Sequence, residues 1–144
     1  MYLLDTSIEI NAAPQKVWDI ITDFGSYGQW NPLSPAAEGK LEQGAVLKIT
    51  IVPAGGKPMA AKCTLTALEP GRKIAWMGKA PIPGMMSGEH ALEVEALPDG
   101  RTRFRNSEVM RGWLFPLMRG SYERGFKPQF HAMNEALKKR AEAG

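Results

Sequence analysis

At 144 residues, with 44% hydrophobic and 23% charged residues, the chain has the composition of one globular domain and not of a disordered or fibrous protein. No apolar run approaches the roughly 20 residues of a membrane-spanning helix. Asp5 and Glu9 interrupt the start, where a signal peptide would be basic and then apolar. We therefore expect a single domain over residues 1–144, without a membrane span, in the cytoplasm.

The net charge of +3 does not by itself indicate a nucleic-acid partner. Basic residues are scattered among acidic ones except at residues 138–140, which lie at a predicted helix end, where cations complement the helix dipole. With one cysteine, Cys63, and two histidines, the chain lacks the ligands of a usual structural zinc site. It also has no nucleotide-binding fingerprint. We expect no metal, no cofactor and no nucleic-acid partner.

Alternation of apolar and polar residues predicts six strands. They cover residues 3–10, 45–52, 61–67, 72–78, 89–96 and 103–110. Between the first two strands, Pro14 marks the start of a helix that ends near Gly25. The segment from Gly25 to Gly44 is rich in Gly, Pro and Ser, and we expect a second short helix or an ordered loop there.

A long amphipathic helix is predicted at the C-terminal end. Its apolar residues recur every three or four positions, at Tyr122, Phe126, Phe130, Met133 and Leu137. Pro128 lies within this helix and removes a backbone donor, so we expect a kink or a break there. Short connections between strands and one covering helix predict an antiparallel α+β fold.

The last two strands carry the most informative pattern. The connection at residues 98–100 has the length and the glycine of a three-residue hairpin loop, which would pair Leu97 with Arg101 and therefore His90 with Glu108. Both residues occupy positions where the alternation places an apolar, inward side chain. Buried polar groups are costly without partners. The pair therefore indicates either a self-satisfied contact or a cavity that uses polar chemistry.

Motifs along the whole chain follow the order of one known superfamily. They are Ile8 to Pro14 leading into Val17 and Trp18; Asp23, Tyr27 and residues 30–32 after the helix; residues 88–90, 100–104 and 108–112 in the late hairpin; and residues 130–137 in the last helix. In these motifs the chain resembles a bacterial branch of the helix-grip (SRPBCC) superfamily. This superfamily includes START lipid-binding domains, pollen-allergen-like proteins and the polyketide cyclase/dehydrase group.

The resemblance implies a curved antiparallel sheet of six to seven strands wrapped around the long C-terminal helix, with one or two short helices after the first strand. It also implies an elongated apolar cavity between the sheet and that helix. The superfamily includes binding proteins, enzymes and co-chaperones, so the fold alone does not give the activity.

Candidate site residues are the inward polar residues and the apolar residues expected near a cavity. The predicted ligand-binding set is Trp30, Trp76, Met85, Met86, His90, Asn106, Glu108, Trp113, Met118, Tyr122, Phe126 and Phe130. Methionine and aromatic side chains adapt to irregular ligands, but the same stripe is also typical of an ordinary core. Cys63 has no assigned base and is interpreted as a small core residue.

Three functions remain open at this point. The first is a protein, monomeric or homodimeric, that binds a hydrophobic or amphipathic molecule such as a lipid, a polyketide or an aromatic metabolite. The second is a cofactor-independent cyclase or dehydratase in which His90 is the catalytic base and Glu108 is the catalytic acid or orients the base. The third is a co-chaperone-like or antitoxin-like interaction module that uses residues 113–116 as an exposed patch.

Overall fold

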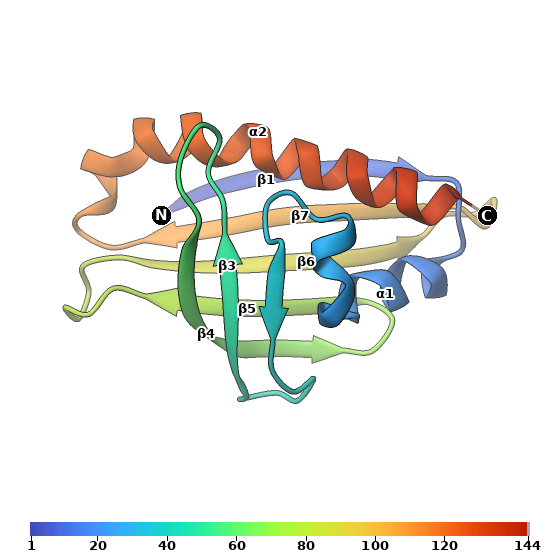
Figure 1. Cartoon of the computed structure of the whole chain (residues 1–144), viewed down its shortest axis with the longest axis horizontal. Helices are drawn as coiled ribbons and strands as arrows, with labels where there is room; N and C mark the ends of the chain where they lie inside the picture. The colour runs from blue at the N-terminus through green and yellow to red at the C-terminus, as the bar shows by residue number, and fades with distance from the viewer. Residues whose placement is uncertain (144) are drawn as a thin grey trace.

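The computed structural model describes residues 1–143 and contains a seven-stranded antiparallel sheet curved around one long helix (Figure 1). Gly144, the last residue of the predicted domain, lies outside the described residues. The strands are β1 (Tyr2–Ile10), β2 (Ala36–Glu38), β3 (Val46–Ile51), β4 (Met59–Glu69), β5 (Lys73–Lys79), β6 (Ser87–Ala96) and β7 (Thr102–Arg111). Their order in the sheet is β1-β7-β6-β5-β4-β3-β2. The predicted α+β helix-grip fold is confirmed.

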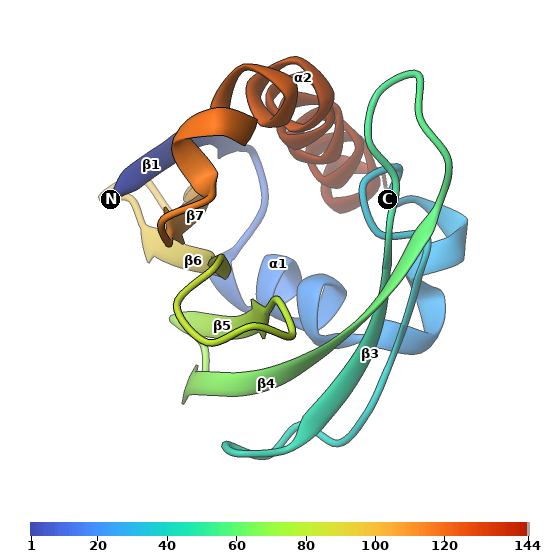
Figure 2. The ribbon, with the colours of Figure 1, turned by 90° about the vertical axis from the view of Figure 1, so that its left-hand side faces the viewer.

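The helices follow the predicted order. Helix α1 (Pro14–Thr22) and a 3-10 helix, η1 (Phe24–Gln29), come after β1, and α2 (Phe115–Glu142) ends the fold. The sequence predicts a kink or a break at Pro128. The predicted break is wrong, because α2 continues through this residue. Figure 2 shows the first turns of α2 running in a different direction from the rest of the helix. Within residues 1–143, no helix combines the length and the apolar character needed to cross a membrane.

The two ends of the space between sheet and α2 differ. At one end, the apolar face of α1 packs against β6 and α2, and Val17, Ile21 and Leu137 are fully buried there. Figure 1 places α1 beside the C-terminal half of α2. Among residues 1–143, no such helix lies beneath the first half of α2, so α2 and loops cover this end of the sheet.

The β6–β7 hairpin has the predicted register. Leu97 donates its N–H to the carbonyl of Arg101 at 2.9 Å, and His90 pairs with Glu108. Gly100 takes the positive φ of 86° that the loop requires. The hairpin prediction is confirmed, and it places both polar residues on the face of the sheet that α2 covers.

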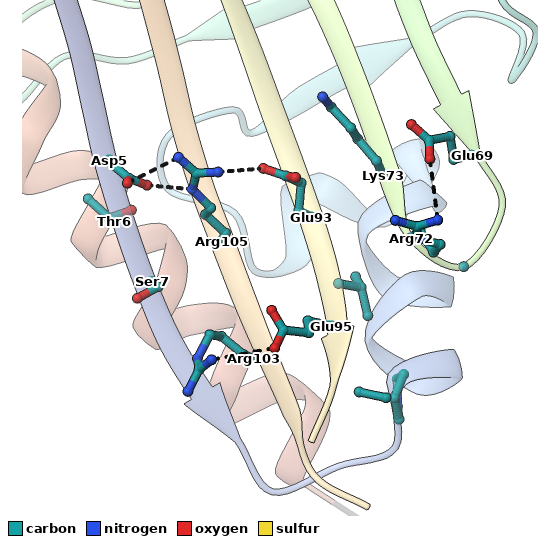
Figure 3. Close-up of a pocket in the computed structure, with 14 residues that line it drawn as sticks. Asp5, Thr6, Ser7, Glu69, Arg72, Lys73, Glu93, Glu95, Arg103 and Arg105 are labelled. Carbon is teal, nitrogen blue, oxygen red and sulfur yellow. Dashed lines mark hydrogen bonds and ion pairs between the residues drawn. The ribbon is translucent and has the colours of Figure 1, made fainter. Parts of the chain in front are cut away.

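The opposite face of the sheet carries charged residues that pair across the strands. Arg105 on β7 bonds Asp5 on β1 at 2.7 Å and Glu93 on β6 at 3.3 Å (Figure 3). Arg103 bonds Glu95 at 3.4 Å in the same way. These residues line a surface hollow of about 830 Å³. Four acidic and four basic side chains line it, so their formal charges balance.

Loop contacts close the end of the fold near the start of α2. Trp113 donates its N–H to the carbonyl of Gly84 at 3.1 Å, which ties the β7–α2 turn to the β5–β6 loop. Gly112 lies in this turn at a φ of 122°, and a Cβ added there would come within 2.3 Å of the Met85 carbonyl oxygen. Only glycine fits this contact.

We expect Gly112→Ala to lower the free energy of unfolding more than Gly100→Ala does. Gly100 also has a positive φ but has no atom near the added Cβ, so its replacement costs about 1 kcal/mol of backbone strain. Gly112→Ala adds a clash with Met85 to the same strain, and we expect a loss of at least about 2 kcal/mol. Urea unfolding of both variants measures the difference; equal losses would contradict the tight contact.

Candidate functional site

A cavity of about 980 Å³ lies between the sheet and the first half of α2. Its walls come from the inward faces of β3 to β7, from α2, and from the β3–β4 and β5–β6 loops. Cavities of this size accommodate drug-sized or larger ligands. The space lies on the side of the sheet that the hairpin prediction assigned to His90 and Glu108.

Small inward side chains leave this end of the sheet hollow. Ala61 and Cys63 on β4, Gly78 on β5 and Gly88 on β6 all line the cavity. A Cβ on Gly88 would lie 2.8 Å from the Met110 sulfur, so larger residues here would displace the wall. The alternation predicted these strands but not the hollow, although the small size of successive inward residues was a readable signal.

The β3–β4 loop forms one rim of the cavity by docking on α2. Ala54 donates its N–H to the carbonyl of Gly125 at 2.7 Å. Gln129 donates from its amide to the carbonyl of Val52 at 2.9 Å. A Cβ on Gly125 would lie 3.2 Å from the Pro53 side chain, so the absence of a side chain lets loop and helix approach. Figure 2 shows this loop reaching α2.

The structure brings most of the predicted ligand-binding residues to the cavity. Eight of them line it, namely Trp76, Met86, His90, Glu108, Met118, Tyr122, Phe126 and Phe130. The other four lie elsewhere. Trp30 packs edge-on against Tyr27 at 5.4 Å, Met85 is in the loop beside Gly112, and Trp113 is 64% exposed over that loop. Asn106 is fully buried behind His90. A ligand-binding role for all twelve remains a prediction.

Glu108 and Tyr122 form one polar element of the cavity wall. The Tyr122 hydroxyl donates to Oε1 of Glu108 at 2.5 Å. Burial raises the pKa of Tyr122 well above its usual range, and the charge of Glu108 adds to this effect. The phenol therefore stays protonated and donates its hydrogen bond to the carboxylate.

His90 forms the second polar element, and it bonds to Asn106 instead of Glu108. Its Nε2 lies 2.6 Å from Oδ1 of Asn106, and its ring is packed between Trp76 at 5.2 Å and Phe130 at 4.8 Å. Burial lowers the pKa of His90, against the opposing effects of the Glu108 charge and the Asn106 bond. The two residues of the predicted pair thus face the same cavity with separate partners, and the histidine is neutral at neutral pH.

Two polar residues behind His90 were missed by the sequence analysis. Asn134 on α2 and Thr6 on β1 are 2% and 5% exposed, and they continue the hydrogen-bond chain that starts at His90 and Asn106. Asn134 follows Met133 in the apolar stripe of the last helix, where a polar residue signals a buried partner. Such a partner cannot be named without knowing which strand lies beneath the helix.

Cys63 fits its prediction as a small buried residue and also lines the cavity. Burial raises the pKa of its thiol, and the charge of Glu108 adds to this. A protonated thiol is a weak nucleophile. Within residues 1–143, no group of three His, Cys, Asp or Glu side chains is arranged to hold a metal ion.

Comparison with known proteins identifies relatives of the chain as a whole. Residues 1–142 match the family model described as polyketide cyclase / dehydrase and lipid transport. None of the curated proteins compared with the chain matches it.

Three similar solved structures share the fold at low sequence identity. The Zhui aromatase/cyclase from Streptomyces sp. R1128 is 19% identical, with a TM-score of 0.74 over 98% of this chain and 93% of that one. A START superfamily protein from Mycobacterium smegmatis is 16% identical, with a TM-score of 0.74 over 99% and 98%. The di-domain aromatase/cyclase BexL from the BE-7585A biosynthetic pathway is 14% identical, with a TM-score of 0.74 over 99% of this chain; the match spans 50% of BexL.

The lowered pKa of His90 predicts a loss of stability in acid. The unfolded chain takes up a proton near the ordinary pKa of 6.5, whereas the folded chain does so only at lower pH. The free energy of unfolding therefore falls as the pH drops below about 6.5, by at most about 1.4 kcal/mol per pH unit for this one group. We expect His90→Gln, which keeps an amide donor toward Asn106, to show a smaller loss than the unsubstituted protein.

Urea unfolding between pH 7.5 and pH 5 measures this difference. The matched control is His131→Gln, because His131 is exposed on the outer side of α2. We expect the control to keep the pH profile of the unsubstituted protein. Identical profiles for all three proteins would show that the folded state does not hold His90 neutral.

Proposed function

Because the chain belongs to the polyketide cyclase / dehydrase and lipid transport family, we propose that it binds a hydrophobic or amphipathic small molecule between the sheet and α2. Lipids, polyketides and aromatic metabolites are the ligand classes that we infer. The observation that carries the proposal is the cavity of about 980 Å³ lined mainly by apolar and small side chains. Its two polar elements lie together in one wall.

The apolar lining can supply the affinity. A ligand that buries about 300 Å² of apolar surface gains on the order of 7 kcal/mol before the cost of association. Trp76, Phe126 and Phe130 provide flat contacts, and Met86 and Met118 adapt to the outline of the ligand. His90 and Glu108 would then fix the orientation of one polar group.

Filling the cavity should abolish binding. We expect Ala61→Phe to weaken the binding of the neutral fluorescent probe N-phenylnaphthylamine by about tenfold or more, because the new ring occupies the space beside Ile49 and Cys63. The control is Thr64→Phe, which places the same ring on the exposed face of β4. Fluorescence titration gives both dissociation constants. Unchanged binding in Ala61→Phe, or no saturable binding in the unsubstituted protein, would refute the cavity as the binding site.

A cyclase or dehydratase is the second candidate, favoured by a neutral imidazole and a carboxylate in one cavity wall. Two of the similar structures are aromatase/cyclases, which gives this chemistry a precedent on the same scaffold. His90 would accept a proton from an activated carbon, and Glu108 would orient the substrate.

Incubation with a linear diketo thioester, followed by chromatography, tests the catalytic candidate. We expect loss of the cyclised product in His90→Gln with little change in the affinity for methoxynaphthalene, which has no donor for His90. Equal product formation in His90→Gln and in the unsubstituted protein would exclude His90 as the catalytic base.

A further inference from the structure

We propose that a series of buried hydrogen bonds fixes His90 in the tautomer that carries its proton on Nε2. The series runs from the main-chain carbonyl of Asn106 through Thr6 and Asn134 to the side-chain amide of Asn106. The free Nδ1 then accepts a hydrogen bond from the ligand, which is an apolar molecule that presents a hydroxyl or N–H group to this wall. This inference rests on the proposed binding function and adds the chemistry of the ligand. Thr6, Asn134 and Asn106 act as positioning residues through His90.

The direction of these hydrogen bonds is set at Thr6, at the end of the series away from His90. The main-chain carbonyl oxygen of Asn106 can only accept a hydrogen bond. Oγ1 of Thr6 lies 2.7 Å from it, so the hydroxyl hydrogen must lie between these two oxygens. Oγ1 must then accept its bond from the Asn134 side chain at 3.0 Å. This requires the NH₂ group of Asn134 to face Thr6 and its Oδ1 to face Asn106.

The same reasoning continues to the imidazole. The NH₂ group of Asn106 donates to Oδ1 of Asn134 at 3.0 Å, which leaves Oδ1 of Asn106 to face His90 at 2.6 Å. An amide oxygen carries no proton, so Nε2 must donate. If both Asn side-chain amides were turned over, Oδ1 of Asn134 would face Oγ1 of Thr6. The Thr6 hydroxyl hydrogen already bonds the main-chain carbonyl of Asn106, so two acceptors would then face each other without a hydrogen. All four side chains are at most 6% exposed, so bulk water does not compete for these bonds.

Nδ1 is the atom left for the ligand. His90 lines the cavity, and within residues 1–143 no group donates a hydrogen bond to Nδ1. Burial lowers the pKa of the ring and keeps this nitrogen unprotonated. The nearby Tyr122 hydroxyl is already used on Glu108, so His90 and Glu108 both offer acceptors to a ligand. A ligand hydroxyl or N–H satisfies them, whereas a carboxylate would oppose them.

The cavity also has cations, but they lie at its exposed rim. Lys62, Lys79 and Arg124 line it with exposed side chains. A carboxylate held at this rim, away from His90, is the competing arrangement. Naphthol, methoxynaphthalene and naphthoate of matching substitution therefore serve as probes, because they share one ring system and differ in the polar group.

The tautomer is tested first, by ¹⁵N NMR of a histidine-labelled His131→Gln chain, in which His90 is the single histidine. We expect a protonated Nε2 and an unprotonated Nδ1 near neutral pH, and a tautomer mixture after the further change Thr6→Val. The control Thr102→Val removes a similar buried bond, from Thr102 to the Ala12 carbonyl at 2.8 Å, and should leave the tautomer unchanged. Thr6→Ser keeps the hydroxyl and should keep the Nε2-protonated tautomer, which gives a second comparison if Thr6→Val is poorly folded.

A protonated Nδ1 in the His131→Gln chain, or the same tautomer in Thr6→Val, would overturn the positioning role. The ligand class is tested next by calorimetric titration. We expect naphthol to bind about tenfold more tightly than methoxynaphthalene and naphthoate, and Thr6→Val to reduce this advantage. Equal affinities, or tightest binding of naphthoate, would overturn the ligand class. If no probe binds while the tautomer is as expected, the binding function fails and the hydrogen-bond chain stands.

Discussion

The hollow beneath α2 depends on a mismatch between the helix and the sheet that it covers. A curved sheet needs its apolar face buried, and at one end α1 and the C-terminal half of α2 complete that burial with Val17, Ile21 and Leu137. At the other end the inward positions hold small residues such as Gly78 and Gly88, and no second helix of the described residues 1–143 fills the space. Helix and loops still cover this end in part, so the missing core leaves a cavity with an exposed rim.

That cavity determines how the polar residues behave. Away from bulk water, each buried donor or acceptor must find a protein partner or one supplied by a ligand. Glu108 takes the Tyr122 hydroxyl and His90 takes the Asn106 amide, although the two residues are paired across neighbouring strands. The hydrogen-bond chain through Asn134 also joins α2 to β1 and β7. It therefore sets the chemistry of His90 and also holds the helix over the sheet.

The fold was readable from the sequence where local chemistry decides it. The β6–β7 register follows from a three-residue loop ending in Gly100, and the long helix from the stripe that includes Phe130. Strand β2 was missed because three residues, Ala36–Glu38, are too short to show alternation, and it exists through pairing with β3. The site was readable only in part. Inward polar residues were visible, but the partner of Asn106 depends on which residue of α2 lies above it.

The geometry also supports our proposing ligand binding ahead of catalysis. A general base needs a pKa near the working pH, and burial of His90 moves its pKa away from that range. The Glu108 charge, which opposes this shift, is at the same time engaged by Tyr122. In the unliganded cavity the imidazole is therefore a weak base and a good hydrogen-bond acceptor. In our proposal, this acceptor with its fixed tautomer orients a bound ligand, and it does so without any proton transfer.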